Sequence, residues 1–370
     1  MKKVLALVLT TVMLFALCAC GKTEAPAAAP AAAPAAEAEP AAAEPELTKL
    51  NVAVMPYAIS LPVFYAIEND MAKDYGLELE MVMFANGATM NEAMASDQFD
   101  VALIGGAGIY GIASYDGVYI SDQVYYEKVD DGELTAGDGI YALADNAAVS
   151  VKGYNPEYPN VCGDPDTVKG STILYTSGTT AHQLVIMWLN DLGIDPSEVN
   201  MLNMDFAQSY NALITGQADF ACLTSPYTTD AQGDGYACVA DGKSLHQSSV
   251  ESMMAPRSFY EKNPEALARF INLIYECNKQ LDAGGVELKT EWMEKWYDYN
   301  GTSYNHDDVY AEMTNGYYAT WDNYGENEFG SYARFVADFY LINELLTPDA
   351  VENVNNNLVT DVMELAKSMK

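Results

Sequence analysis

Basic residues are scarce in this chain. It has 18 lysines and arginines against 53 aspartates and glutamates, which gives a net charge of −35 at pH 7. A protein of this charge repels the phosphate backbone of nucleic acids and the anionic surface of membranes. The composition therefore excludes nucleic acid as a partner, and it excludes electrostatic binding to a lipid surface.

Residue patterns typical of metal centres are also missing. The three histidines, at positions 182, 246 and 306, are scattered along the chain. Beyond residue 20 the cysteines are Cys162, Cys222, Cys238 and Cys277, and no two of them have the Cys-x-x-Cys spacing of zinc sites. We expect no metal site. Cys222 and Cys238 lie on two consecutive predicted strands, so the pair is either a disulfide or two buried thiols.

Long apolar runs are absent after residue 17, and we expect no transmembrane helix. Before it, Lys2 and Lys3 precede an apolar run over 4–17, which is short for a permanent span and has the flanks of a cleaved signal. The run ends in Leu-Cys-Ala-Cys, a pattern that resembles a bacterial lipobox. It predicts a signal peptide over 1–19 and lipidation of Cys20, with an ordinary signal peptide as the alternative.

The next segment, residues 20–47, is dominated by alanine, proline and glutamate and has no aromatic residue. Such a composition does not build a hydrophobic core, so we expect an extended linker. Together the two segments predict an extracytoplasmic protein that is held at the bacterial cell membrane only by its lipid anchor.

The remaining chain contains a weak internal duplication. Gln98-Phe99-Asp100-Val101-Ala102 recurs as Gln217-Ala218-Asp219-Phe220-Ala221, and each copy follows a predicted helix and opens a predicted strand. Strands alternate with helices around both copies, which indicates βαβ units and parallel sheets. The predicted strands are 50–55, 77–84, 101–104, 172–175, 199–202 and 220–223, and the predicted helices are 61–76, 88–96, one ending at 193 and 205–216.

After about residue 257 the pattern becomes helical, with predicted helices from Pro264, over 330–346, and a last one from Pro348. We therefore predict an α/β protein of two lobes, each a mainly parallel sheet flanked by helices. The first lobe comprises 48–140 and 242–370, including the helical tail, and the second comprises 141–241.

Several short motifs, in the order in which they follow one another along the chain, resemble those of one protein family. Taken with the lipobox and the two α/β lobes, the chain is similar to the substrate-binding lipoproteins of ABC importers, in the branch for nitrate, sulfonate, taurine and thiamine-pyrimidine precursors. The resemblance implies the type II periplasmic binding protein fold, a small-molecule ligand and importer permease subunits as partners. The sequence gives no sign of oligomerisation, so we expect a monomer. The motifs are YGLELE (75–80), FDVALIG (99–105), VKGSTI (168–173), LGI (192–194), GQAD (216–219) and KNPE (262–265).

Ligands of open α/β sheets bind beyond the carboxyl ends of the strands, so the loops at that edge supply the candidate site. The best candidate is the start of the helix after residue 176, where backbone N–H groups and hydroxyls favour an acceptor, with Ser177 as the expected N-cap. Asp205 is either a ligand contact or only a helix cap. The candidate ligand-binding residues are Tyr57, Ile59, Gly105, Gly106, Ala107, Ser177, Gly178, Thr179, Thr180, His182, Asp205, Ser225 and Tyr227.

The candidate loops, 55–62, 85–89, 105–111, 176–182, 203–209 and 224–229, contain no lysine or arginine. Only helix ends and His182 would be available to stabilise a fully charged anion, so a neutral, zwitterionic or heteroaromatic ligand is favoured.

Two other functions compete with solute transport. A sensory lipoprotein would present the same ligand to a receptor, and the sequence does not separate this from transport. An enzyme related to thiamine-pyrimidine synthases would need a nucleophile, a cofactor lysine or metal ligands in the cleft, but the loops contain no lysine and the sequence has no histidine cluster and no Gly-x-Ser-x-Gly motif. We expect no catalytic residues and no cofactor.

Overall fold

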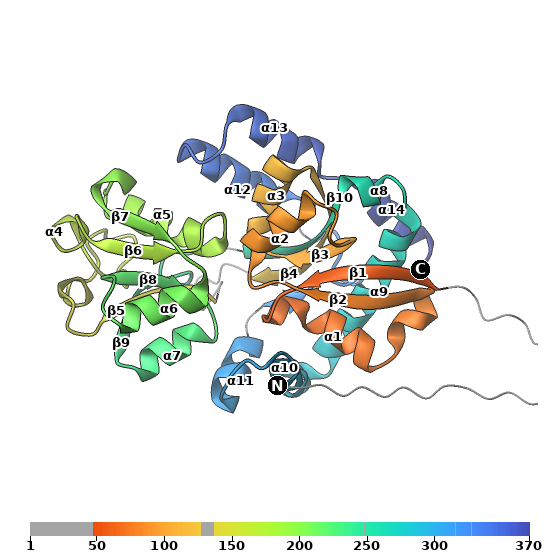
Figure 1. The fold of residues 1–370 in the computed structure, drawn as a ribbon, viewed down its shortest axis with the longest axis horizontal. Coiled ribbons are helices and arrows are strands. Elements are labelled where there is room, and N and C mark those ends of the chain that lie inside the picture. The colour runs from red at the N-terminus through yellow and green to blue at the C-terminus, as the bar shows by residue number, and fades with distance from the viewer. Residues whose placement is uncertain (1–46, 127–136, 248, 315, 327) are drawn as a thin grey trace, which may run out of the picture. The chain divides into compact units, whose positions relative to one another are not determined.

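The computed structural model describes residues 47–126, 137–247, 249–314, 316–326 and 328–370. The predicted signal peptide, Cys20 and all of the predicted linker except Leu47 lie outside these residues. The described residues form two β-sheets that belong to one compact unit of the chain (Figure 1).

The first sheet has six strands in the order β11-β4-β10-β3-β1-β2. Strand β1 pairs in parallel with β2 and β3, whereas β10 is antiparallel to both β3 and β4. The strands are β1 (Thr48–Val54), β2 (Leu77–Met83), β3 (Val101–Ile104), β4 (Gly117–Tyr126), β10 (Ser249–Pro256) and β11 (Tyr317–Tyr318).

The second sheet has five strands in the order β7-β6-β8-β5-β9. Strand β6 is parallel to β7 and β8, and β5 is antiparallel to β8 and β9. This repeats the order β2-β1-β3-β10-β4 of the first sheet, so the predicted duplication of architecture is confirmed. The strands are β5 (Gly139–Leu143), β6 (Thr172–Tyr175), β7 (Asn200–Asn203), β8 (Phe220–Leu223) and β9 (Tyr236–Asp241).

The repeated aspartate has the same structural role in both sheets. The backbone N–H of Asn51 donates to Asp100 Oδ2 at 2.7 Å, and the backbone N–H of Thr172 donates to Asp219 Oδ2 at 2.8 Å. In both cases the carboxylate stands just before the third strand of its unit and accepts from the neighbouring parallel strand. The motif that revealed the duplication therefore fixes the start of a strand in each sheet.

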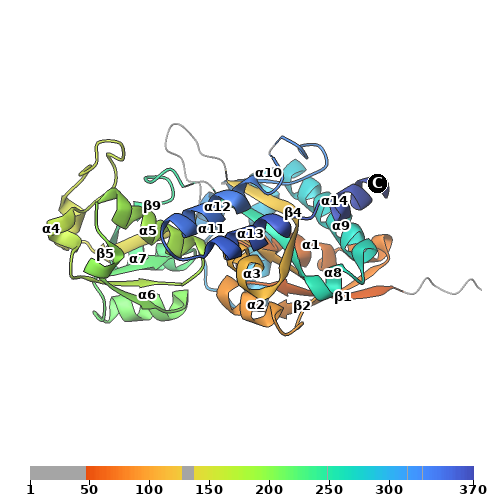
Figure 2. The ribbon, with the colours of Figure 1, turned by 90° about the horizontal axis from the view of Figure 1, so that it is seen from above.

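Helices cover both faces of each sheet, as Figure 1 shows: α1 and α9 lie opposite α2 and α3 on the first sheet, and α5 lies opposite α6 and α7 on the second. Figure 2 shows α12 and α13 beside α3. The helices are α1 (Leu61–Glu68), α2 (Gly87–Met94), α3 (Ala107–Tyr115), α4 (Pro165–Val168), α5 (Thr180–Asp191), α6 (Phe206–Ile214), α7 (Tyr227–Gly233), α8 (Arg257–Tyr260), α9 (Pro264–Ala283), α10 (Gly285–Asn300), α11 (His306–Thr314), α12 (Ser331–Ile342), α13 (Pro348–Asn356) and α14 (Asp361–Ser368). Short 3₁₀ turns are η1 (Ala58–Ser60), η2 (Met71–Tyr75), η3 (Ala147–Ser150) and η4 (Pro196–Glu198).

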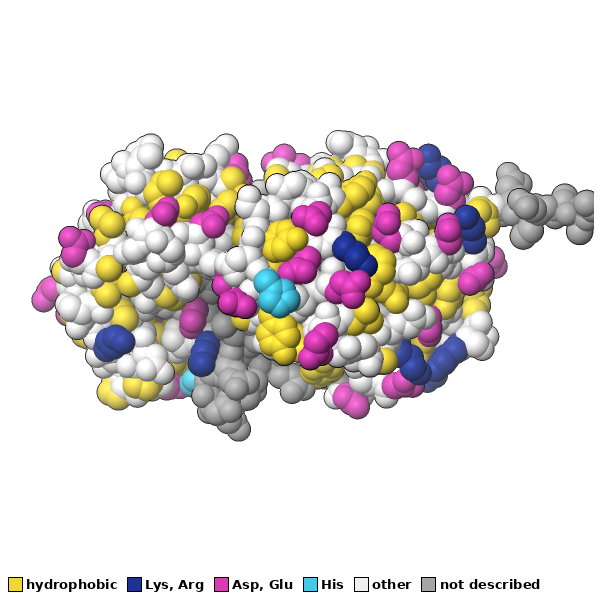
Figure 3. Space-filling model, turned by 90° about the horizontal axis from the view of Figure 1, so that it is seen from below, with side chains coloured by type: hydrophobic (Ala, Val, Ile, Leu, Met, Phe, Trp, Pro, Cys, Tyr) yellow, Lys and Arg dark blue, Asp and Glu magenta, His cyan; other side chains and the backbone are white. Residues whose placement is uncertain are grey.

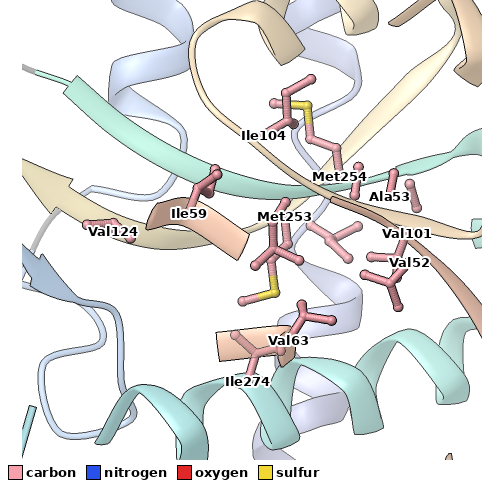
Figure 4. Packing of buried hydrophobic residues seen from close by; sticks show 14 of the residues in the cluster. Val52, Ala53, Ile59, Val63, Val101, Ile104, Val124, Met253, Met254 and Ile274 are labelled. Atoms are coloured by element: carbon pink, nitrogen blue, oxygen red, sulfur yellow. The ribbon is translucent and has the colours of Figure 1, made fainter. Parts of the chain in front are cut away.

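Each sheet has its own hydrophobic core. The core of the first sheet includes the buried side chains of Val52, Val101 and Met253, which pack against Val63 and Ile274 of the covering helices (Figure 4). The helical tail contributes to this same core, as the sequence predicted. Trp188 and Phe220 anchor the core of the second sheet.

Two details differ from the predictions. The helix expected over 61–76 ends at Glu68, because Asp70 adopts a left-handed φ of 55° before η2 begins. The helix from Pro348 is not the last, since α14 follows it. Of the two alternatives for Cys222 and Cys238, the structure shows free thiols, because β5 lies between their strands and keeps them apart; the other two described cysteines are free as well.

Candidate functional site

A cavity of about 100 Å³ lies between the two sheets. Most of its lining follows the carboxyl ends of the parallel strands β1, β3, β6 and β8, which is where open α/β sheets bind ligands. Residues from both sheets therefore face one space. The lining residues are Tyr57, Ala58, Ile59, Gly105, Gly137, Asp138, Thr180, Thr224, Ser225, Ser249, Glu251 and Glu312.

Three carboxyl groups line this cavity, each from a different part of the chain. Asp138 directly precedes β5 and is only 5 % exposed, Glu251 lies on β10, and Glu312 lies on α11. Glu312 Oε2 accepts from the Tyr297 hydroxyl at 3.0 Å and from Ser225 Oγ at 3.3 Å. By contrast, Asp138 Oδ2 and Glu251 Oε2 are enclosed and have no hydrogen-bond partner among the described residues.

Two of these carboxyls occupy equivalent positions of the duplicated architecture. In the first sheet Ser252 pairs with Ile104, the last residue of β3, and in the second Gly139 pairs with Leu223, the last residue of β8. Glu251 and Asp138 directly precede Ser252 and Gly139. A register shift between β10 and β4 at Glu251 marks a bulge there, a device that often re-aims side chains beside binding sites.

Burial dominates the electrostatics of the three acids. Loss of solvent raises the pKa of Glu251 to about 8, with added repulsion from Glu312 and Asp138. It raises the pKa of Glu312 to about 7, although the hydrogen bonds from Tyr297 and Ser225 oppose the change. The pKa of Asp138 is also raised by burial, and the neighbouring Thr180 and Thr224 hydroxyls partly offset this. The site therefore holds protons near neutral pH.

Five of the thirteen residues predicted from the sequence line the cavity: Tyr57, Ile59, Gly105, Thr180 and Ser225. Tyr57 donates its hydroxyl to the Ala85 carbonyl at 3.1 Å, and its ring meets Phe206, the first residue of α6 on the second sheet, edge-on at 6.3 Å. Its side chain therefore forms a wall where the two sheets meet.

His182 lies behind the cavity wall. Its ring is packed between Tyr175 and Tyr340, and its Nδ1 accepts the Gly178 backbone N–H at 3.2 Å. Burial lowers the pKa of His182 to about 4, so the ring is neutral at pH 7. The expectation that His182 adds a donor or a positive charge for an anion does not fit this environment.

The other predicted residues of this loop have structural contacts, and two of them, Gly178 and Thr179, contact helices of the first half. Helix α5 begins at Thr180 with Thr179 as its N-cap, so the predicted N-cap role of Ser177 is wrong. The Ser177 N–H instead donates to Asn203 Oδ1 at 2.9 Å. Thr179 offers its carbonyl to the Tyr340 hydroxyl at 3.1 Å. Gly178 has a left-handed φ of 70° and lies against the ring of Tyr110.

Four predicted residues lie beside the cavity without lining it. Gly106 faces Thr180 so closely that a Cβ there would lie 3.2 Å from Thr180 Cγ2. The Ala107 carbonyl accepts from the buried Asn91 side chain. Asp205 caps α6 by accepting the Gln208 N–H at 2.9 Å, and Tyr227 opens α7 and packs against another tyrosine.

The sequence reasoning missed the three acids. Glu251 stands in a strand whose next residues, Ser-Met-Met-Ala-Pro, are apolar or small, and an acid in such a strand is a signal of a site. Asp138 and Glu312 carried no comparable signal, because single acids are common in a chain with 53 of them. The missed lining residues are Ala58, Gly137, Asp138, Thr224, Ser249, Glu251 and Glu312.

Two further findings concern the part of the chain that the structure describes. Within it, no three side chains of His, Cys, Asp or Glu are grouped so that they could hold a metal ion. No helix in the same residues has the length and apolar character needed to cross a bilayer.

Comparison with known proteins gives concordant results. Residues 43–291 match the model of the NMT1-like family. A Brachyspira hyodysenteriae protein, which its name assigns provisionally to the periplasmic binding proteins of ABC transporters, is 29% identical over 318 residues, covering 86% of this chain and 89% of the relative.

Solved structures share the fold. The aliphatic sulphonate binding protein SsuA from Escherichia coli aligns with a TM-score of 0.60 and 17% identity over 82% of this chain and 91% of its own. The nitrate-binding protein NrtA from Synechocystis PCC 6803 aligns with a TM-score of 0.65 and 13% identity over 88% and 90%. These matches show the periplasmic binding protein fold, and the family match shows that the chain belongs to the NMT1-like family.

Proposed function

We propose that this protein is the extracytoplasmic solute-binding component of an ABC importer. It captures a small organic molecule in the cavity between its two sheets and delivers it to the permease subunits. The names of the Brachyspira relative and of the sulphonate- and nitrate-binding structures support the transport role.

The single observation that carries the proposal is the origin of the cavity wall. Glu251 lies on β10 of the first sheet and Gly105 directly follows β3, whereas Thr224 directly follows β8 of the second sheet and Thr180 begins α5, which packs on that sheet. A ligand bound there contacts both sheets and stabilises their approach, which is the hinge-closure mechanism of binding proteins. Around the cavity the two halves also contact each other directly, as Tyr57 does with Phe206 and Tyr340 with Thr179.

We propose binding without catalysis. The side chains that line the cavity in the described structure are hydroxyls, carboxyls and apolar groups, with no lysine, cysteine or histidine to serve as a nucleophile or cofactor anchor. A monomer suffices for this role, because one chain supplies every wall of the cavity.

We also propose that Cys20 is lipidated and anchors the protein to the membrane. The lipobox pattern and the Ala/Pro/Glu segment after it support this. In a bacterial host that processes lipoproteins, the wild-type chain should appear in the membrane fraction and incorporate labelled fatty acid. Cys20→Ser should abolish the labelling, and labelling that persists in that variant would contradict the proposal.

A thermal-shift screen tests the binding function. The full chain in mild detergent is unfolded by heat while tryptophan fluorescence is recorded, with panels of organic cations, neutral molecules and anions. A ligand at about a thousand times its dissociation constant should stabilise the folded state by roughly 4 kcal/mol.

A cavity-filling variant locates the effect. A Cβ on Gly105 meets only Glu251 Cγ, at 3.9 Å, so Gly105→Leu can fold while its side chain fills the cavity. The thermal shift should be lost in Gly105→Leu and retained in Gly233→Leu, a matched change at an exposed position of α7 with no atom within 4 Å. Retention of the shift in Gly105→Leu would show that the ligand binds elsewhere.

A further inference from the structure

We propose that the ligand is an organic cation, such as an ammonium, amidinium or guanidinium compound, held by the carboxylates of Asp138, Glu251 and Glu312. This inference rests on the proposed binding function and adds the charge class of the ligand. It departs from the neutral or zwitterionic ligand that the sequence favoured, and from the anions named for the sulphonate- and nitrate-binding structures.

The first argument is the charge of the cavity wall. Three of the twelve lining residues are acids, and none is a lysine, arginine or histidine. An enclosed carboxylate without a partner is costly, and it is normally compensated by an opposite charge or by protonation. An anion placed in this cavity would meet like charge at each acid that is ionised, and its binding would require the acids to stay protonated. A cation would supply the missing counter-charge.

The second argument is the unsatisfied hydrogen-bonding capacity. Asp138 is 5 % exposed, and its Oδ2 has no partner among the described residues; the same holds for Oε2 of Glu251. Buried polar atoms are otherwise almost always paired. In the ionised carboxylates both oxygens are acceptors only, so a group that satisfies them in that state brings N–H or O–H donors. Amidinium and guanidinium groups offer several donors in one plane together with a positive charge.

The third argument is the spacing of the acids. They come from three different elements, and Glu312 is already fixed by Tyr297 and Ser225. The three carboxyls are not gathered as metal ligands in the described structure. Donors spread over an organic molecule reach such separated acceptors more readily than a single ion does.

The surrounding titratable groups do not offset this charge. Tyr297 of α10 and Tyr318 of β11 face Glu312, while Tyr332 of α12 lies near Asp138 and Glu251, and burial raises the pKa of all three hydroxyls. They are neutral at pH 7. Lys289 of α10 shares a small neighbouring pocket with Glu312, but it pairs with Asp282 at 3.4 Å and does not line the cavity.

The raised pKa values predict two effects that distinguish a cation from other ligands: proton release on binding and a change of affinity with pH. Because Glu251 and Glu312 hold protons near pH 7 in the free protein, a bound cation should expel part of them. Cation binding should therefore release protons and strengthen as the pH rises from 6 to 8. A neutral ligand should do neither, and an anion should bind more tightly at pH 6.

Charge-matched probes test the proposal on the full chain in detergent. One series is benzamidine, benzamide and benzoate, and a smaller series is methylguanidine, methylurea and acetate. These are added to a wider panel of amines, neutral compounds and anions. We expect melting temperature to rise with cations only, and calorimetry in two buffers of different ionisation enthalpy to show proton release.

Variants connect the effect to the acids. Asp138→Asn and Glu251→Gln should each weaken binding of the best cation by at least about tenfold. The control Glu352→Gln changes an exposed acid on α13 and should leave binding unchanged. The two cavity variants are independent, so one that fails to fold does not remove the test.

Each other outcome is decisive. Tighter binding of a neutral or anionic compound than of any cation overturns the charge assignment and leaves the binding function intact. Stabilisation by Mg²⁺, Ca²⁺ or Zn²⁺ that EDTA reverses, without any effect of organic cations, also overturns it. If no compound of any charge stabilises the protein, both the charge assignment and the binding function are rejected.

Discussion

The buried acid Glu251 makes a quantitative prediction for the stability of the protein without ligand. Its pKa rises from an ordinary 4.5 to about 8 on folding. Between these two values the folded chain binds more protons than the unfolded chain, so the free energy of unfolding must fall as the pH rises. The loss of folding stability that the raised pKa causes is absent below pH 4.5 and complete above pH 8. Glu251→Gln removes it, because glutamine does not ionise.

The size of the effect follows from the same values. At pH 7 the carboxyl is ionised in the unfolded chain and mostly protonated in the folded chain. Since pH 7 lies roughly 2.5 pKa units above the ordinary value, keeping the proton in the folded chain lowers the free energy of unfolding by about 3 kcal/mol. Repulsion from Glu312 contributes to this free energy, so about 3 kcal/mol is the upper limit of the stabilisation expected from Glu251→Gln. At about 2 °C per kcal/mol for a chain of this size, Glu251→Gln should raise the melting temperature by up to roughly 6 °C.

Thermal unfolding at pH 5, 6, 7 and 8 in the absence of ligand checks this prediction. The gain from Glu251→Gln should be small at pH 5 and grow towards pH 8, while Glu352→Gln on the surface should show no such trend. An equal change of melting temperature at pH 5 and pH 8 would refute the reasoning, since it would show that Glu251 has the same pKa in the folded and unfolded chains.

Three further predictions concern the fold itself. Gly178→Ala should destabilise the protein by about 1–2 kcal/mol in urea titrations, because alanine disfavours the left-handed backbone at this position. The control Gly235→Ala, with a φ of 87° and no atom within 4 Å, measures the backbone cost without the contact that Gly178 makes with Tyr110. A larger loss of stability at Gly235 than at Gly178 would contradict the account. Asp100→Ala should cost about 1–3 kcal/mol, since two donors of Asn51 lose their half-buried acceptor, and an unchanged urea midpoint would argue against the strand-start role. Because the described cysteines are free, reductant should leave the melting temperature of the chain unchanged, whereas a shift on reduction would indicate a disulfide.

The duplicated architecture was predictable from the sequence because it depends on local patterns. The strand–helix alternation and the repeated Asp100 and Asp219 reflect hydrogen bonds between neighbouring strands, and those recur wherever the same geometry recurs. The ends of helices were less predictable. Ser177 has the residue type of an N-cap, yet α5 begins three residues later, because the Ser177 N–H is engaged by Asn203 on the neighbouring strand.

The candidate site was predictable only in part, for a physical reason. Tyr57, Gly105 and Thr180 follow the ends of predicted strands, so the fold class alone places them near a ligand. Asp138 and Glu312 reach the cavity through long-range packing between distant segments, which no local pattern records. A large acidic surplus, distributed over the surface as Figure 3 shows for one face, hides the acids that are buried.

The repeated strand order has an evolutionary consequence for ligand choice. Val52 and Ile173 hold the same register position in the two halves, and Ile59 and Thr180 follow them by the same number of residues. The equivalent loop position is thus apolar in one half and carries a hydroxyl in the other, while both halves place an acid directly before the residue that pairs with the last residue of β3 or β8. A substitution in one half can change the ligand contacts of that half without altering the other half. Ligand specificity in such a molecule can therefore evolve through one side of the cavity at a time.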